Sequence, residues 1–125
     1  MRTLFVCTGN TCRSPFAEAV ARREGHDVES AGLIARAGDR PPEDAIVVAR
    51  RLGYDLSSHR ARPLTEEMLE RSDLVVGMTA AHVAAVGGRA RLLGEAELDD
   101  PIGRGRDAYR QVYAQIETDV RNLFA

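Results

Sequence analysis

The sequence has no tryptophan and few aromatic residues, with three tyrosines and three phenylalanines among 125 residues. It also lacks an excess of basic charge, since 17 Lys and Arg residues face 19 Asp and Glu residues, and this argues against nucleic-acid binding. No apolar run is long enough to cross a membrane, and the N-terminus lacks the long apolar segment of a signal peptide. These absences predict a cytoplasmic protein without a membrane or nucleic-acid partner.

Cysteine is almost absent too, because only Cys7 and Cys12 are present, and they lie close together. Such a pair fits a reducing compartment and a chemical role better than a disulfide scaffold. Histidine, cysteine and acidic residues nowhere show metal-ligand spacing, so we expect no metal and no other cofactor. A length of 125 residues favours one domain over residues 1–125, and we expect a monomer.

Short apolar segments alternate with helical patterns along the chain. Strands are predicted at residues 2–7, 28–32, 73–78 and 90–93. Helices are predicted at 14–24, 43–52, 79–86 and 107–124, with a short helix after Thr65. This alternation predicts an α/β domain whose sheet is mostly parallel, with helices on both faces.

The ends of the first helix carry recognisable signals. Ser14 is a good N-cap, and Pro15 would then stand at the first helical position, where its missing N–H costs nothing. Gly25 is predicted to terminate this helix.

The segment between the first strand and the first helix reads Cys-Thr-Gly-Asn-Thr-Cys-Arg, and its residues 7–13 are called the 7–13 loop below. A loop closed between a strand and a helix points backbone N–H groups inward, which makes a nest for an oxyanion. Arg13 adds a planar two-pronged donor, and in this field the Cys7 thiol is expected to lose its proton easily and act as a nucleophile. The alternative, a buried core cysteine, leaves Gly9, Asn10 and Arg13 unexplained.

A cysteine and an arginine separated by five residues, followed by Ser-Pro near the N-terminus, resemble the active-site P-loop of the low-molecular-weight protein phosphatases. The resemblance implies a single phosphatase domain over residues 1–125, with a three-layer, Rossmann-like fold and four parallel strands in the order 2-1-3-4. It also implies attack of Cys7 on phosphorus and a phosphocysteine intermediate. The phosphate oxygens would be held by Arg13 and by the backbone N–H groups of Thr8, Gly9, Asn10, Thr11, Cys12 and Arg13.

Phosphoryl transfer also needs an acid that protonates the leaving group. The family's acid is the Asp of an Asp-Pro pair before the last helix, and Asp100, before Pro101, matches it. Asp99 is the lesser candidate. Considered alone, this segment is better read as a turn, because Asp before Pro is common in loops. Together with the 7–13 loop, the acid is the favoured interpretation.

Three further residues match supporting positions of the family. Ser14 would donate to the thiolate, and Ser30, in a Ser-Ala-Gly stretch, would brace the 7–13 loop through Asn10 together with His59. Considered alone, His59 is better explained as a surface histidine. His26 and His82 have no partner that the sequence indicates.

Cys12 has two interpretations. It is a small core residue, or it is a resolving thiol that forms a reversible disulfide with Cys7 under oxidation. The resemblance implies the second, since relatives share the pair.

The substrate class depends on Thr11. Tyrosine phosphatases of this type commonly carry a larger aliphatic residue there, and the Cys7–Pro15 segment as a whole is more similar to the bacterial protein-arginine phosphatases. We therefore expect phosphorylated proteins as partners and phosphoarginine as the favoured substrate, with phosphotyrosine as the alternative. Ile102 stands where both classes usually carry an aromatic ring, so it supports neither.

Two other classes of function remain open from the sequence. An arsenate-reductase-like thiol reductase shares the fold and the loop, but its relay needs more cysteines than Cys7 and Cys12. A non-catalytic phosphoprotein-binding module would need the anion nest, but neither the nucleophile nor the acid.

Overall fold

The computed structural model describes all residues from 1 to 125 and contains one sheet of four parallel strands. The strands are β1 (Arg2–Cys7), β2 (Asp27–Gly32), β3 (Leu74–Gly77) and β4 (Arg91–Leu92). Their spatial order is β2-β1-β3-β4, so the predicted order and parallel direction are confirmed. The strands predicted at 73–78 and 90–93 are shorter than expected, because their ends turn into loops.

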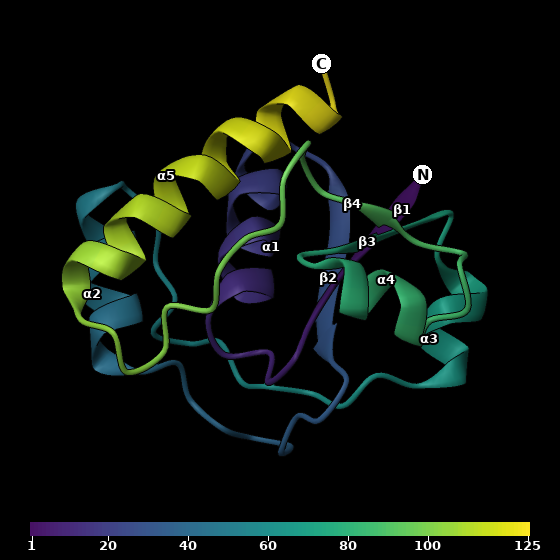
Figure 1. Cartoon of the computed structure of the whole chain (residues 1–125), viewed down its shortest axis with the longest axis horizontal. Helices are drawn as coiled ribbons and strands as arrows, with labels where there is room; N and C mark the ends of the chain where they lie inside the picture. The colour runs from purple at the N-terminus through teal and green to yellow at the C-terminus, as the bar shows by residue number, and fades with distance from the viewer.

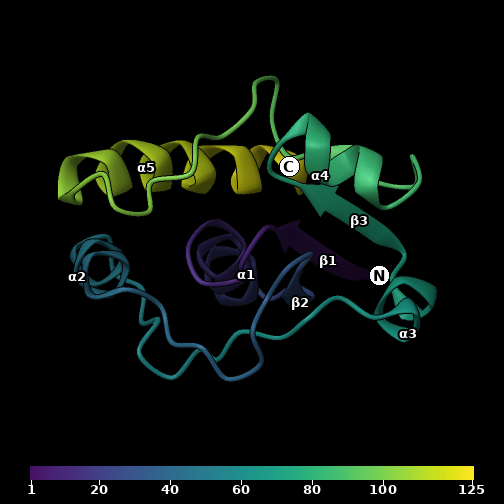
Figure 2. The same ribbon diagram turned by 60° about the horizontal axis from the view of Figure 1, so that its bottom comes forward.

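Five helices cover the two faces of the sheet: α1 (Arg13–Arg23), α2 (Glu43–Arg51), α3 (Glu66–Arg71), α4 (Ala80–Ala85) and α5 (Arg106–Leu123). Figures 1 and 2 show α1, α2 and α5 on one side of the sheet and α3 and α4 on the other. None of the five is long and apolar enough to cross a membrane.

The alternation of side chains along β1 produces two cores. Phe5 and Cys7 point into the larger core, where Phe16 of α1 stacks on Tyr113 of α5 with ring centroids 4.0 Å apart. Leu4 and its neighbours on that side of the strand fill a smaller core under α3 and α4. Cys7 is therefore directed toward the face that α1 and α5 cover.

The start of α1 differs from the prediction. The helix begins at Arg13 with Cys12 as its N-cap, and Ser14 does not cap it. Ser14 contacts other side chains instead, and Pro15 still lies in the first turn, where backbone N–H groups need no helical partner. Gly25 terminates the helix as predicted, with a φ of 90° and its N–H bonded to the carbonyl of Arg22.

The chain after β2 supports the 7–13 loop. The N–H groups of Leu33 and Ile34 donate to the carbonyls of Cys7 and Thr8 at 3.0 and 2.9 Å. Gly32 allows this close approach, because a Cβ there would lie 2.7 Å from the Thr8 carbonyl oxygen. The loop thus lies at the carboxyl edge of the sheet, where parallel α/β folds bind ligands.

Candidate active site

Cys7 ends β1, and its thiol is almost completely buried. Its Sγ lies 2.9 Å from the Oγ of Ser14, which is also buried. Because α1 starts at Arg13, the positive end of this helix faces the 7–13 loop. The sulfur thus has the Ser14 hydroxyl as its hydrogen-bond partner, close to the start of α1.

Asn10 gives the 7–13 loop its bend, since it is the one non-glycine residue with positive φ, at 54°. This conformation costs about 1–2 kcal/mol outside glycine, so other contacts must stabilise it. The Asn10 amide donates to Ser14 Oγ at 2.8 Å and to Ser30 Oγ at 2.9 Å, and its Oδ1 accepts from the Arg62 N–H at 3.0 Å. His59 Nε2–H donates to the Asn10 carbonyl at 2.8 Å. The structure thus brings Ser14, Ser30 and His59 together on one residue.

Glu18 extends this network and was missed from the sequence. The Ser30 hydroxyl donates to the buried Glu18 carboxylate, which also pairs with Arg22 at 2.6 Å. Glu18 lies one turn after Ser14 on the same face of α1, and this spacing was the one available signal. The network orients the hydroxyl of Ser30, so that its lone pairs face the Asn10 amide.

Arg13 is held over the same loop from two sides. It is 4% exposed, and its Nη1 donates to the Leu98 carbonyl at 2.9 Å. Its Nη2 lies 3.6 Å from Asp100 Oδ2. Its Nε–H is buried and has no hydrogen-bond partner. Because a buried guanidinium donor normally has an acceptor, this N–H indicates a place for an oxygen of an anion.

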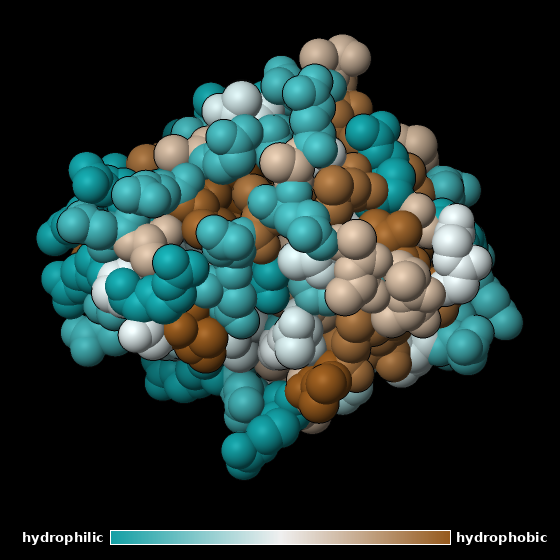
Figure 3. Space-filling view, viewed as in Figure 1, coloured by the Kyte–Doolittle hydropathy of each residue, from teal (hydrophilic) through white to brown (hydrophobic).

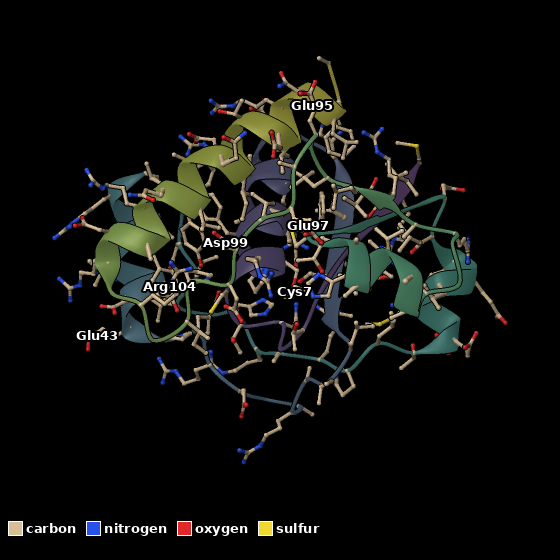
Figure 4. All side chains as sticks on the ribbon, in the orientation of Figure 1. Cys7, Glu43, Glu95, Glu97, Asp99 and Arg104 are labelled. Carbon is tan, nitrogen blue, oxygen red and sulfur yellow. The ribbon has the colours of Figure 1, made fainter.

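Asp100 forms the turn that was one interpretation of the Asp-Pro segment, and its second carboxylate oxygen points to Arg13. Its Oδ1 accepts from the Ile102 N–H at 3.1 Å, which is the expected turn, while its Oδ2 faces Arg13. The side chain is 44% exposed, so the carboxyl can exchange protons with water. Asp99 is exposed and makes no hydrogen bond or ion pair. Figure 4 shows Asp99 and Arg104, on the segment before α5, to one side of Cys7.

Cys12 lies on the inner side of the loop, where two tyrosines of α5 contact it. Its Sγ is 3.2 Å from the Tyr109 hydroxyl, and its carbonyl accepts from the Tyr113 hydroxyl at 2.8 Å. Burial raises the pKa of the Cys12 thiol, so this cysteine is kept protonated. Both Cys7 and Cys12 are free thiols. The helical periodicity of α5 indicated only core packing for these tyrosines, so their polar contacts were missed.

The remaining loop residues form the rim. Thr8 is exposed, Gly9 and Thr11 are half-buried, and the Thr11 hydroxyl lies 3.7 Å from Cys12 Sγ. Thr8 has a partner that the sequence did not indicate, because its hydroxyl lies 3.0 Å from Nε2 of His82.

Burial lowers the pKa of His59 and also that of His82, which falls from 6.5 to about 4. The charge of Arg13 adds to the lowering for His82, whereas Asp100 and Glu97 oppose it. Both rings therefore stay neutral in the folded protein at pH 7.

These histidines should make the protein sensitive to acid. Below pH 6.5 the unfolded chain takes up protons on His59 and His82 that the folded protein does not bind, so the free energy of unfolding should fall as the pH is lowered from about 6.5 toward 4. Urea denaturation at several pH values measures this slope, and His82→Gln should make it shallower. An equal slope in that variant would contradict the prediction.

Comparison with known proteins places these residues in context. The family described as low molecular weight phosphotyrosine protein phosphatase matches residues 2–125. The protein-arginine-phosphatase of Bacillus subtilis (strain 168) is 37% identical over 142 aligned positions, covering 98% of this chain and 94% of that protein. The low molecular weight protein-tyrosine-phosphatase Etp of Escherichia coli (strain K12) is 35% identical, covering 91% and 86%. A solved structure of the YwlE arginine phosphatase, a mutant with a phosphorylated active-site serine, superposes with a TM-score of 0.88 at 35% identity, covering 98% and 93%.

Proposed function

The chain belongs to the low molecular weight phosphotyrosine protein phosphatase family, and we propose that it hydrolyses phosphoarginine in proteins through a phosphocysteine at Cys7. As a member of this family it is a hydrolase of phosphoproteins. The observation that supports the site most strongly is the buried Nε–H of Arg13, held over the 7–13 loop without a protein acceptor.

In the first step the Cys7 thiolate attacks phosphorus, and the bond from phosphorus to the leaving nitrogen breaks. Arg13 and the backbone N–H groups of residues 8–13 stabilise the charge on the phosphoryl oxygens. Asp100 gives its proton to the leaving nitrogen, so that the arginine side chain departs as a guanidinium cation. The carboxyl is placed for this role, because its Oδ2 lies 3.6 Å from the Arg13 group that would hold the phosphoryl oxygens.

In the second step water attacks the phosphocysteine. Asp100 takes a proton from the water, the bond from sulfur to phosphorus breaks, and phosphate leaves. The Cys7 thiolate is re-formed, and the Ser14 hydroxyl, 2.9 Å away, stabilises its charge.

The positions of the aromatic residues weaken a stacking pocket for phosphotyrosine. Phe5, Phe16, Tyr54, Tyr109 and Tyr113 are all buried, and Phe124 stacks on His26 near the end of α5. The exposed large hydrophobic residues are aliphatic: Met1, Ile34 and Ile102. Figure 3 shows mostly hydrophilic side chains on the left of the face that it presents and hydrophobic ones gathered from its right of centre to its lower edge. The rim thus offers no exposed ring on which a phenol could stack, whereas hydroxyls such as that of Thr11 suit a planar polar guanidinium.

Thr11→Ile tests the substrate class. We expect the wild-type protein to release phosphate from a phosphoarginine peptide with a higher kcat/KM than from a phosphotyrosine peptide of the same sequence. Thr11→Ile should reduce this ratio by about 10-fold or more, because the hydroxyl is lost and an aliphatic wall is gained. Thr11→Ser keeps the hydroxyl and should retain most of the preference. A wild-type preference for phosphotyrosine would overturn the proposal.

Phosphotyrosine is the second candidate, favoured by the tyrosine phosphatases among the relatives. The comparison of the phosphoarginine peptide with the phosphotyrosine peptide tests this candidate as well. A protein that releases phosphate from neither peptide would instead act as a thiol reductase or as a binding module.

We also propose that Cys7 and Cys12 form a reversible disulfide. A peroxide converts the Cys7 thiolate to a sulfenic acid, the Cys12 sulfur attacks it, and water leaves as the disulfide forms. A dithiol then reduces the disulfide to two thiols. The neighbouring positions of both thiols on the 7–13 loop support this step, although the Tyr109 contact and the raised pKa of Cys12 should slow it.

Cys12→Ser tests the disulfide. After peroxide and then dithiothreitol, the wild-type protein should regain most of its initial activity. Cys12→Ser should regain little of its own initial activity, because Cys7 is then oxidised irreversibly. Equal recovery in both proteins would contradict the redox role.

We further propose that residues 1–125 act as one monomeric, cytoplasmic domain without a cofactor. The single sheet and its continuous larger core support the domain assignment. Sedimentation measures the oligomeric state directly.

A further inference from the structure

His82 is a buried titratable residue that the proposed mechanism does not use. It lies in α4 and is 4% exposed. The hydroxyl of Thr79, the N-cap of α4, accepts from the His82 backbone N–H at 3.2 Å. Gly77, at the end of β3, allows α4 to approach closely, because a Cβ there would lie 3.0 Å from that of His82. The fold therefore places the ring under the rim of the 7–13 loop.

The two ring nitrogens of His82 have different partners. The Met78 backbone N–H donates to Nδ1 at 3.3 Å, so Nδ1 carries no hydrogen. The neutral ring then carries its hydrogen on Nε2, which donates to the Thr8 hydroxyl at 3.0 Å. The lowered pKa of His82 keeps this tautomer populated at neutral pH.

Thr8 is fixed by these contacts in both its backbone and its side chain. Its carbonyl accepts from the Ile34 N–H at 2.9 Å, and its Oγ1 accepts from His82. A hydroxyl has two lone pairs and one hydrogen, so one lone pair and the hydrogen remain available. Thr8 is exposed and directly follows Cys7, so these remaining valences face the rim of the site.

We propose that His82 is a positioning residue that selects phosphoarginine by fixing the Thr8 hydroxyl at the rim. In phosphoarginine a phosphoryl oxygen and a guanidinium N–H are close neighbours, on either side of the bond from phosphorus to nitrogen. One fixed hydroxyl can accept from that N–H and donate to that oxygen. A phosphotyrosine has the oxygen but no N–H. This inference rests on the proposed phosphoarginine activity.

A purely structural role for His82 leads to a different expectation. If the ring only packed α4 against the sheet, its loss would lower stability and slow all substrates alike. A positioning role acts through Thr8 and changes the preference between substrates. The two roles therefore differ in the ratio of kcat/KM for a phosphoarginine peptide to kcat/KM for p-nitrophenyl phosphate, which lacks the N–H.

A double-mutant cycle measures this ratio in Thr8→Val, His82→Phe and the double variant. We expect each single variant to reduce the ratio by about 10-fold, the effect of one well-placed hydrogen bond. The double variant should be no worse than either single variant, because both changes remove the same contact. His82→Gln, which keeps an N–H toward Thr8, should restore most of the ratio. His26→Phe, remote from the rim, is the control for replacing a histidine.

Several results would overturn the inference. Losses that multiply in the double variant, or an equal slowing of both substrates by His82→Phe, would assign His82 a structural role. If His82→Phe does not fold, the two Thr8 variants test the inference instead. Thr8→Val, which lacks the hydroxyl, must then reduce the ratio of kcat/KM values, and Thr8→Ser, which keeps the hydroxyl, must not. A wild-type protein inactive on the phosphoarginine peptide would overturn the proposed function and this inference with it. If the wild-type protein is active on the phosphoarginine peptide but Thr8→Val leaves the ratio unchanged, the inference about His82 is overturned and the proposed function stands.

Discussion

Cys7→Ser is expected to lower the rate of phosphate release by at least about 10⁴-fold, because the variant loses the nucleophile. A serine hydroxyl stays protonated near neutral pH, and its hydrogen-bond partner would be another hydroxyl, that of Ser14. Steady-state phosphate release from the phosphoarginine peptide measures the loss.

The same variant should still bind inorganic phosphate. The backbone N–H groups of the 7–13 loop and the guanidinium of Arg13 do not depend on the sulfur. Titration calorimetry therefore serves as the control for an intact loop. Turnover within about 10-fold of the wild-type rate would remove Cys7 from the mechanism.

The second large effect on the rate of phosphate release is expected from Asp100→Ala. We expect release from phosphoarginine to slow by about 10²–10⁴-fold, the usual contribution of general acid catalysis. The nitrogen that leaves belongs to a strongly basic guanidine, so its departure depends on the proton from Asp100. The p-nitrophenolate anion leaves well without a proton, so p-nitrophenyl phosphate should lose less.

Asp99→Ala is the matched control, since Asp99 is the neighbouring carboxylate, is exposed and forms no ion pair with Arg13. It should leave the dependence of the rate on the leaving group unchanged. Equal losses for both substrates in Asp100→Ala would contradict the role of Asp100 as an acid. A leaving-group effect in Asp99→Ala would transfer that role to Asp99.

The sequence was sufficient for the order of elements and for the 7–13 loop because both depend on local patterns. Alternating apolar and helical segments predicted the parallel sheet, and Gly25 marked a helix end through its freedom to adopt positive φ. The cysteine, the arginine and the short polar residues between them occupy one continuous segment. A strand that ends at Cys7 and a helix that begins at Arg13 then create the nest.

Contacts between distant segments could not be read in the same way. Ser14 is a residue type favoured at N-caps, but its hydroxyl contacts Cys7 and Asn10 instead, and the helix starts two residues earlier than predicted. His82 meets Thr8 only because β1 and β3 are adjacent, across 74 positions of sequence. The structural preference of a residue reflects its neighbours in the sequence, so it predicts neither the contacts of the Ser14 hydroxyl nor the contact of His82 with Thr8.

The most direct test of the central claim is to follow the phosphoryl group itself. A peptide carrying labelled phosphoarginine is mixed with the wild-type protein, the reaction is quenched within one turnover, and the label is located by peptide mapping. The account predicts that the label appears on the peptide containing Cys7 before it appears as free phosphate. Free phosphate formed at the full rate, with no label passing through Cys7, would contradict it.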